Sequence, residues 1–326
     1  MDGRQVREWL RRPNPHGKSN ALVLRPYLNA ADLTGRTSDA WMIDFHGFDA
    51  AEAGLFEGPF DYVVRVVKPV RDTKKEPYLR QKYWLLKRPA IDLRVALQAL
   101  PRYIATARVA KHRFFVFLDA SVLPDSRLNA IARADDLTFG LLSSRIHEVW
   151  ALANASMHGV GNDPTYNAKS CFETFPFPAG LTPADTAHQR TETLPSGAQI
   201  PADLPPSPTR TAAEAIATAA HRLHSLRDQW LNPPEWTRRV PEVIPLGMAA
   251  SPYPDRIEAK LGHDKDLAER TLTKLYNHRP AWLQAAHATL DAAVARAYGW
   301  ADYAADMPDE TLLARLLALN LVRSAR

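Results

Sequence analysis

The sequence predicts an α+β fold in which a mixed α/β domain with an antiparallel sheet precedes a mainly helical module. Short apolar runs with strand character recur before residue 178, whereas beyond residue 211 the apolar residues follow a helical spacing almost throughout. Between these parts, residues 178–208 contain seven prolines, which is typical of a linker or a long wrapping loop. We therefore expect a first domain at residues 1–178, a Pro-rich linker at residues 179–210 and a helical domain at residues 211–326.

Three apolar runs in the first domain predict strands. Trp41–Phe45 is one of them, and a short connection joins the other two, Arg102–Arg108 and Phe114–Leu118, so these two should pair antiparallel. A helix is predicted at Asp49–Gly58, because an Asp can cap its first turn and a Gly can end its last. A second helix is predicted at Asp92–Leu100. Together these elements indicate helices packed on an antiparallel sheet.

The stretch Phe139–Pro178 is predicted to combine two rigid elements with a polar loop. Its first part has apolar residues at spacings of three and four, which predicts a helix that ends near Ser156, before two glycines. A polar run follows at residues 162–167. Cys171–Phe175 then predicts a strand that Pro176 would end, because proline cannot donate to a strand ladder. We expect the loop to present hydrogen-bonding side chains, although an ordinary surface loop is the alternative.

Helical spacing of Ala, Leu and Ile characterises the second domain. Ala281–Tyr298, which Gly299 closes, is the clearest helix. The other predicted helices are Thr211–Trp230, Asp266–Tyr276 and Pro308–Leu319.

Composition indicates an ordinary globular protein. Of the 326 residues, 46% are hydrophobic and 24% are charged, and no apolar run approaches the roughly 18 residues that cross a bilayer. The N-terminus lacks the apolar core of a signal peptide. Cys171 is the only cysteine, which excludes intramolecular disulfides and cysteine-based metal sites. We therefore expect a cytoplasmic protein without membrane contact.

Positive charge is concentrated in one segment. The formal net charge of the chain is +5, but residues 65–113 carry 14 Lys and Arg against three Asp and Glu. Tyr and Trp residues are interleaved with these charges. Such a segment favours a polyanionic partner, whereas a solvated basic face, the alternative, usually mixes both signs.

Ordered motifs along the chain carry a resemblance to a known family. The chain resembles the C-terminal part of the large adenine-specific DNA methyltransferases of the MmeI-like type, which occur in restriction–modification and phage-defence systems. In that family this part is the target-recognition domain and the helices near it, and the catalytic methyltransferase domain lies N-terminal to them. The resemblance rests on WMIDF (41–45), EAGLFEGPFDYV (52–63), VKPVRD (67–72), YWLLKRP (83–89), RYIATARVAKHRFFVF (102–117), FGLLSSRIHEVWA (139–151), FETFPFP (172–178), WLNPPEWTR (230–238), RTLTKLYNHRPAWL (270–283), LDAAVARAYGW (290–300) and LLARLLALN (312–320).

The catalytic parts of such an enzyme are not evident in this sequence. A cofactor site for S-adenosylmethionine needs a Gly-rich turn after a strand, but Gly159-Val160-Gly161 follows a predicted helix. Asn232-Pro233-Pro234 is similar to the Asn-Pro-Pro-aromatic motif that grips a flipped adenine, but Glu235 replaces the aromatic residue and a helix precedes it. We therefore predict a helix terminus at Asn232 and no catalytic residue or cofactor in this chain. S-adenosylmethionine is implied for the full-length enzyme or for a separate methyltransferase chain.

Double-stranded DNA is the predicted partner, with two sets of contacts. The alternating side chains of the central loop offer hydrogen-bonding groups for base edges, and in an extended segment they would project from one side. The predicted base contacts are Asp163, Thr165, Asn167 and Lys169. The predicted contacts with the DNA backbone are Arg71, Lys74, Lys75, Arg80, Lys82, Arg108, Lys111 and Arg113.

Other interpretations of the sequence stay open. The chain could be a catalytically complete DNA-modifying enzyme with an unrecognised site near Asp44, His46 and Glu52, or a gene remnant without function. His221 and His224 are three residues apart on a predicted helix, but no third ligand is evident near them, so no metal site is predicted.

Overall fold

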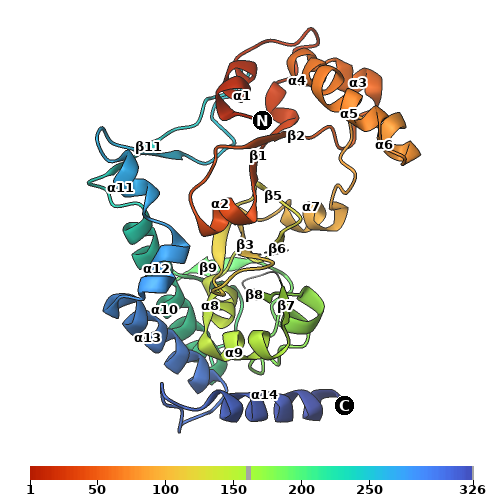
Figure 1. Cartoon of the computed structure of the whole chain (residues 1–326). Coiled ribbons are helices and arrows are strands. Elements are labelled where there is room, and N and C mark those ends of the chain that lie inside the picture. The colour runs from red at the N-terminus through yellow and green to blue at the C-terminus, as the bar shows by residue number, and fades with distance from the viewer. Residues whose placement is uncertain (159–162, 325–326) are drawn as a thin grey trace.

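The computed structural model of the chain describes residues 1–158 and 163–324 and confirms a mixed α+β fold. Figure 1 shows the N-terminal elements at the top, short strands in the middle and the long C-terminal helices at the left and bottom. None of the helices within these residues combines the length and the apolar character that crossing a membrane requires.

The first part of the chain, residues 1–88, forms an N-terminal body around two antiparallel strands. β1 (Leu24–Leu28) pairs with β2 (Trp41–Ile43), which confirms a strand in the predicted run 41–45. The predicted helix at 49–58 is two short helices, of which the first is capped at Asp49. The helices here are α1 (Gly3–Leu10), α2 (Ala30–Thr34), α3 (Ala50–Gly54), α4 (Glu57–Tyr62), α5 (Lys68–Asp72) and α6 (Pro77–Gln81), with a 3-10 turn at Asn20–Leu22 and a π-helical turn at Val63–Val67.

A second sheet forms the centre of the molecule. β3 (Arg102–Ala107) lies between β4 (Val116–Asp119) and β6 (Leu128–Ile131), and both pairings are antiparallel. The two predicted strands that flank residues 109–112 are thereby confirmed, although the second begins two residues late. β5 (Leu123–Pro124) pairs in parallel with β1 and links this sheet to the N-terminal body, while α7 (Ile91–Leu97) precedes β3.

The central stretch differs from its prediction in two ways. The single predicted helix is two helices, α8 (Asp136–Ser143) and α9 (Arg145–Ala153), because Ser144 adopts an extended conformation and its hydroxyl caps the second helix. A hairpin follows, with β7 (Ser156–His158) paired to β8 (Asp163–Thr165). The predicted strand at 171–175 was wrong, since Ala168–Phe172 is a π-helical turn whose backbone hydrogen bonds are local, as between Glu173 N and Ala168 O at 2.9 Å.

The Pro-rich segment packs closely against the helices. It forms a hairpin of β9 (Thr191–Thr193) and β10 (Gln199–Pro201). Leu181, Ala198 and Ile200 are buried in the same hydrophobic cluster as the central helices, and the backbone N–H of Gln199 donates to the Asp136 carboxylate at 2.7 Å. The segment therefore wraps along the surface of the core.

The C-terminal part is mainly helical, but it contains one hairpin that the sequence analysis missed, formed by β11 (Thr237–Val240) and β12 (Arg256–Ala259). Two predicted helices are confirmed as α10 (Pro208–Leu231) and α13 (Ala281–Ala297), and α14 (Asp309–Ser324) covers the fourth. The predicted helix 266–276 is instead two helices, α11 (Asp264–Ala268) and α12 (Leu272–His278). Thr271 caps the N-terminus of α12 and lies between the two helices.

Close packing of α8 on α10 joins the sheet and the C-terminal helices in one hydrophobic cluster. That cluster runs from Tyr103 to Leu316, with Leu33 as its member from the N-terminal body. A side chain on Gly140 would begin 2.8 Å from the Cγ2 atom of Ile216 and 2.9 Å from the Cβ atom of Ala220. Only glycine permits this approach without displacement of the neighbouring helix.

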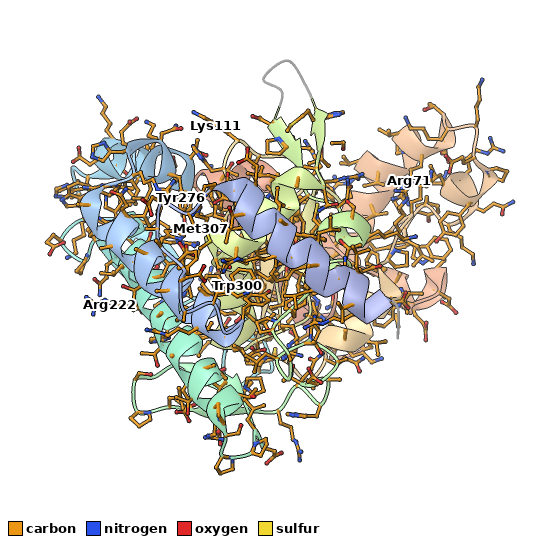
Figure 2. The ribbon with its side chains drawn as sticks, turned by 90° about the horizontal axis from the view of Figure 1, so that it is seen from below. Arg71, Lys111, Arg222, Tyr276, Trp300 and Met307 are labelled. Atoms are coloured by element: carbon orange, nitrogen blue, oxygen red, sulfur yellow. The ribbon has the colours of Figure 1, made fainter. Side chains whose placement is uncertain are left out.

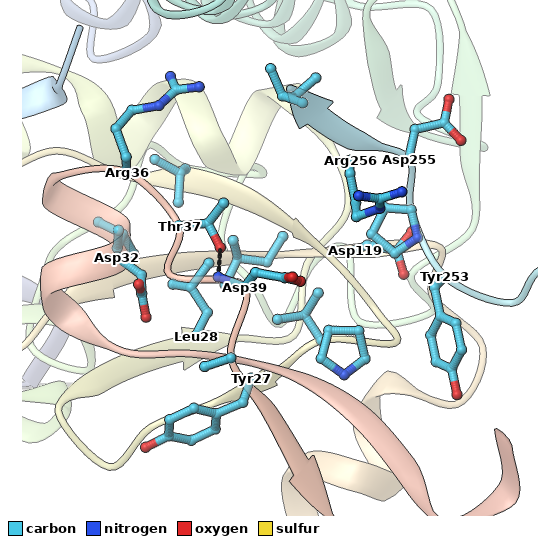
Figure 3. Close-up of a pocket in the computed structure, with 18 of the residues that line it drawn as sticks. Tyr27, Leu28, Asp32, Arg36, Thr37, Asp39, Asp119, Tyr253, Asp255 and Arg256 are labelled. Carbon is cyan, nitrogen blue, oxygen red and sulfur yellow. Dashed lines mark hydrogen bonds between the residues drawn. The ribbon is translucent and has the colours of Figure 1, made fainter. Parts of the chain in front are cut away.

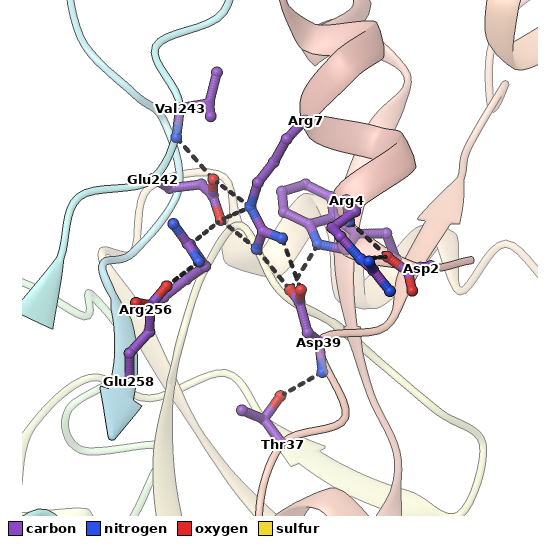
Figure 4. A network of polar contacts seen from close by, with 10 residues as sticks. Asp2, Arg4, Arg7, Thr37, Asp39, Glu242, Val243, Arg256 and Glu258 are labelled. Atoms are coloured by element: carbon purple, nitrogen blue, oxygen red, sulfur yellow. Dashed lines mark hydrogen bonds and ion pairs between the residues drawn. The ribbon is translucent and has the colours of Figure 1, made fainter. Parts of the chain in front are cut away.

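The connection between β11 and β12 (residues 241–255) ties the N-terminal body to the C-terminal part. The body has its own hydrophobic cluster, which includes Tyr253 from this connection, and the Tyr253 hydroxyl donates to Leu24 O at 2.8 Å. The Arg7 guanidinium donates to the buried Glu242 carboxylate at 2.9 Å and to Asp39 at 2.7 Å (Figure 4). Because Glu242 is almost fully buried, loss of Arg7 would leave its carboxylate with Arg256, at 3.2 Å, as its remaining ion-pair partner.

Buried Asp291 yields a prediction about stability. Burial raises the pKa of Asp291 from 3.8 to about 7, although its carboxylate accepts a hydrogen bond from Arg145 N at 2.7 Å. A carboxyl whose pKa is raised by folding destabilises the folded state as pH rises from 3.8 to 7. Asp291→Asn should therefore increase the free energy of unfolding at pH 8, by at most about 4 kcal/mol at 1.36 kcal/mol per unit.

The measurement is urea unfolding of both proteins between pH 4 and pH 8. The gain should shrink towards zero at pH 4, close to the ordinary pKa of 3.8, because the carboxyl is then protonated in the folded state and only partly ionised in the unfolded state. Asp306→Asn, at an exposed carboxylate of the same region, is the control and should change little. An equal gain at both pH values would contradict the electrostatic explanation.

Candidate nucleic-acid interface

The β7–β8 hairpin is attached to the end of β3. The backbone N–H of Tyr166 donates to Arg108 O at 2.7 Å, and Val109 and Thr165 form an isolated β-bridge. The Asn129 amide donates to Tyr166 O at 2.8 Å. The structure thus brings together two segments, around Arg108 and around residues 163–167, which the sequence analysis had assigned to backbone and base contacts separately.

Buried polar side chains hold the hairpin from beneath. Tyr166 is 2% exposed, and its hydroxyl forms a hydrogen bond with His147 Nε2 at 2.9 Å. The Arg113 guanidinium donates to Thr106 Oγ1 at 3.0 Å and to Pro164 O at 3.1 Å, and it also binds Ala107 O. These hydrogen bonds connect β8, through Pro164, to the end of β3.

Burial shifts the pKa values of the three side chains beneath the hairpin, His147, Tyr166 and Arg113. It lowers the pKa of His147 to about 3, so the imidazole is neutral at physiological pH. It also raises the pKa of the Tyr166 phenol and lowers that of Arg113. Arg113 nevertheless stays protonated, because a guanidinium does not lose its proton in proteins.

The predicted base contacts do not all project from one side. Asp163 and Asn167 are half-buried and Lys169 is exposed, whereas Thr165 is 7% exposed and faces the interior. The strand alternation ends at Thr165, and Lys169 lies on the π-helical turn that follows. The Asn167 side chain caps no backbone N–H of that turn and has no hydrogen-bond partner among residues 1–158 and 163–324. Residues 159–162, with the predicted glycine turn, lie outside the described residues.

Three arginines among the predicted contacts with the DNA backbone donate hydrogen bonds to backbone carbonyl oxygens, and Lys111 donates to Asn277 Oδ1 at 2.8 Å. Arg71 donates to the carbonyl oxygen of Leu85, Arg80 donates to Lys74 O at 3.0 Å, and Arg113 is buried beneath the hairpin. Their guanidinium groups stabilise the local backbone conformation. The remaining five are exposed: Lys74, Lys75, Lys82, Arg108 and Lys111.

The exposed contacts, together with the half-buried Asp163 and Asn167, belong to two patches. The α5–α6 patch consists of Lys74, Lys75 and Lys82, and the Lys82 ammonium lies 5.2 Å from the centre of the Trp84 ring. The hairpin patch consists of Arg108, Lys111, Asp163, Asn167 and Lys169. Figure 1 places α6 at the upper right and β7 and β8 at the lower right, and Figure 2 shows Lys111 and Arg71 well apart.

Sequence reasoning missed Arg127 beside the hairpin patch. Its side chain is 78% exposed and pairs with Asp125 at 3.1 Å, and its carbonyl oxygen accepts a hydrogen bond from Arg108 N at 2.8 Å. Arg127 lies outside the basic segment 65–113, and only the pairing of β3 with β6 brings it there. No sequence signal marks that pairing.

One pocket lies away from both patches. It has a volume of about 570 Å³ between β1, β4 and β12, and none of the predicted contact residues lines it (Figure 3). Several of its polar groups bind one another. The Arg36 guanidinium donates to Asn232 Oδ1 at 2.9 Å, and Asp32 accepts a hydrogen bond from Ser38 N at 2.8 Å.

The residues that suggested other chemistry have structural contacts. Asn232 is the C-terminal cap of α10, as predicted, and its amide binds Asp228 and Arg36. Asp44 is ion-paired with Arg94 at 2.6 Å, and Glu52 belongs to the capping box of α3. Across residues 1–158 and 163–324, no group of three or more His, Cys, Asp or Glu side chains could hold a metal ion.

Comparison with known proteins identifies a structural relative. No family model and no curated protein matches the chain. The fold is similar to that of MmeI, a Type IIL restriction-modification enzyme solved in complex with DNA, with a TM-score of 0.57 and 17% sequence identity. The match covers 94% of this chain and 32% of that chain. At this level of identity the similarity concerns the fold, and this chain corresponds to less than half of the relative.

The buried anchor yields a second prediction. Tyr166→Phe removes the hydroxyl that binds His147 and leaves a buried imidazole nitrogen without a partner, which should lower the free energy of unfolding by about 1–3 kcal/mol. Urea denaturation at pH 7.5 measures the change. Tyr78→Phe, at a tyrosine that is 43% exposed, is the matched control and should be neutral. Equal effects of both substitutions would show that the buried hydrogen bond does not stabilise the hairpin.

Proposed function

We propose that this chain is the DNA-recognition module of an adenine-specific, S-adenosylmethionine-dependent DNA methyltransferase of restriction–modification or phage-defence type. The observation that carries the proposal is the similarity in fold, over 94% of the chain, to a restriction-modification enzyme that was solved with DNA. The motifs of MmeI-like enzymes along the sequence support the same assignment. Double-stranded DNA is the proposed partner, and the cytoplasm is the proposed location.

Cations of the two patches are proposed to bind phosphates. Lys74, Lys75 and Lys82 would contact the DNA backbone from one part of the surface, and Arg108 and Lys111 would contact it beside the hairpin. All five are exposed, and ammonium and guanidinium groups that neutralise phosphates release counterions, which favours binding to any sequence. Such contacts position the protein on the duplex without selecting a sequence.

Base recognition is assigned to Asp163, Asn167 and Lys169. A carboxylate accepts from the cytosine amino group, an amide can bind adenine through two hydrogen bonds, and an ammonium donates to the acceptors of guanine. We omit Thr165 from this set because its side chain is buried. The rigid anchor of Tyr166 would hold the remaining groups in place and thus limit the entropy lost on binding.

Methyl transfer is proposed to require a part outside this chain, either the rest of a longer enzyme or a separate catalytic chain. Isothermal titration with S-adenosylmethionine separates this proposal from a catalytically complete enzyme. We expect no heat of binding from this chain, and a binding isotherm that is accompanied by methylation of DNA would contradict the assignment as a recognition module.

Phosphate contacts at the α5–α6 patch yield a third prediction. If both lysines bind phosphate, Lys74→Gln/Lys75→Gln should weaken binding to all DNA sequences alike and reduce the slope of log K against log salt by about 1.8, at 0.9 per contact. Fluorescence anisotropy over a series of salt concentrations measures the slope. The control is Lys18→Gln/Lys265→Gln, which removes the same charge at two exposed lysines elsewhere. Identical slopes for the two double variants would remove the α5–α6 patch from the interface.

A fourth prediction concerns Asn167. If its amide contacts a base, Asn167→Ala should weaken binding to the preferred site by about 1–3 kcal/mol and leave nonspecific binding nearly unchanged. Selection from randomised duplexes with wild type and variant measures the preference at each position. Gln229→Ala, at an exposed amide on α10, is the control and should keep the wild-type consensus. A consensus that survives Asn167→Ala unaltered would return this loop to an ordinary surface loop.

A further inference from the structure

The turn between α12 and α13 extends the hairpin patch from the C-terminal helices. It consists of Asn277, His278 and Arg279, all exposed, and none of these residues belongs to the basic segment that the sequence analysis singled out. We propose that this turn is a further binding site for the DNA backbone and that Arg279 contacts a phosphate. The inference rests on the proposed function, since it adds a contact to the same DNA-binding face.

Direct contacts place the turn beside the hairpin patch. The Asn277 side-chain oxygen accepts a hydrogen bond from Lys111 Nζ at 2.8 Å and lies 2.8 Å from His112 Nε2. The Tyr276 ring lies 5.2 Å from the ring of Phe114, centre to centre. Figure 2 shows Tyr276 close to Lys111. A duplex that reaches Lys111 would therefore also reach the residues after Tyr276.

Buried contacts hold the turn in one position. Leu272 and Leu275 are buried in the main hydrophobic cluster. The Tyr276 hydroxyl forms a hydrogen bond with His287 Nε2 on α13 at 3.0 Å, so both helices that flank the turn are tied together. The exposed side chains thus extend from a backbone whose position is fixed, which reduces the conformational entropy lost on binding.

Arg279 has an unfavourable backbone conformation. Its φ and ψ are 44° and 62°, in the left-handed region, and Pro280 follows directly. Glycine or asparagine is the usual residue at such a helix end, and another residue there carries backbone strain. Strained positions of this kind cluster at functional sites. A role of the side chain would explain why an arginine, and not a glycine, occupies this position.

Cations and carboxyl groups both lie around the turn. Burial raises the pKa of Glu148, and the charges of Arg279, His112 and Arg113 oppose that rise, which places all three close to this carboxyl group. The carboxyl groups of the half-buried Glu148 and the buried Asp291 both lie near Arg279, and Asp309 lies near Glu148. No hydrogen bond or ion pair within the described residues engages the exposed Arg279 guanidinium, so its donors can bind an external anion. On a face that binds DNA, that anion is a phosphate.

The test compares three variants at position 279 and one control. Arg279→Asn removes the charge, and asparagine tolerates the left-handed conformation, so the fold should persist. Arg279→Lys retains the charge. Arg222→Gln removes an exposed arginine on α10, which Figure 2 shows well away from Lys111. Arg279→Gln serves as a second neutral variant, and thermal unfolding midpoints verify that all proteins are folded.

Fluorescence anisotropy measures the binding constant over a series of salt concentrations. Two duplexes are used, one selected by the wild type and one unrelated to it. We expect Arg279→Asn and Arg279→Gln to weaken binding to both duplexes and to reduce the slope of log K against log salt by about 0.9. Arg279→Lys and Arg222→Gln should keep the wild-type slope.

The outcomes distinguish this inference from the proposed function. If wild type binds DNA but Arg279→Asn has the same affinity and slope as Arg222→Gln, the inference is overturned and the proposed function stands. If the wild-type chain binds neither duplex at low salt, both are overturned. A loss confined to the selected duplex would also overturn the phosphate contact, because a phosphate contact does not depend on sequence.

Discussion

A buried arginine and tyrosine beneath the hairpin are the constraint on which the proposed interface depends. Arg113 joins the end of β3 to Pro164, and Tyr166 joins the same segment to His147 of α9. A buried polar group is stable only with its partners in place, so these bonds permit one arrangement of the loop and not several. The residues around Arg108 and Asn167 thereby share one surface.

The two cation patches belong to different bodies, so the connection between those bodies sets their separation. The α5–α6 patch lies on the N-terminal body, whose hydrophobic cluster includes Trp84, whereas the hairpin patch lies on the main cluster. The β11–β12 connection joins the bodies through Glu242 and Tyr253. The separation of the two patches therefore depends on the buried ion pair of Arg7 and Glu242 together with the pairing of β5 with β1.

Several cations of the basic segment have partners within the chain. Arg71, Arg80 and Arg113 donate to backbone carbonyl oxygens, and Arg94 pairs with buried Asp44. A guanidinium suits this because its planar set of donors binds several oxygens at once and it is weakly hydrated. Lysines 74 and 75 are exposed and have no such partner in the described part of the chain. The charge count of this segment therefore exceeds the number of cations that a polyanion can reach.

The sequence by itself determined the fold class, the strand pairs around residues 109–112, the helices α10 and α13 and the cap at Asn232, because local spacing and end residues specify these elements. It failed where long-range contacts decided the backbone. The Cys171–Phe175 run has aromatic residues compatible with a strand, yet no strand among residues 1–158 and 163–324 pairs with it, and the chain closes its hydrogen bonds locally instead. Three features of the site depend on contacts between distant residues: the burial of Thr165, the position of Arg127 next to Arg108, and the contact of Asn277 with Lys111. The last of these joins residues 166 positions apart. Only tertiary packing decides which distant side chains share a surface, since sequence spacing determines neighbours within an element and not between elements.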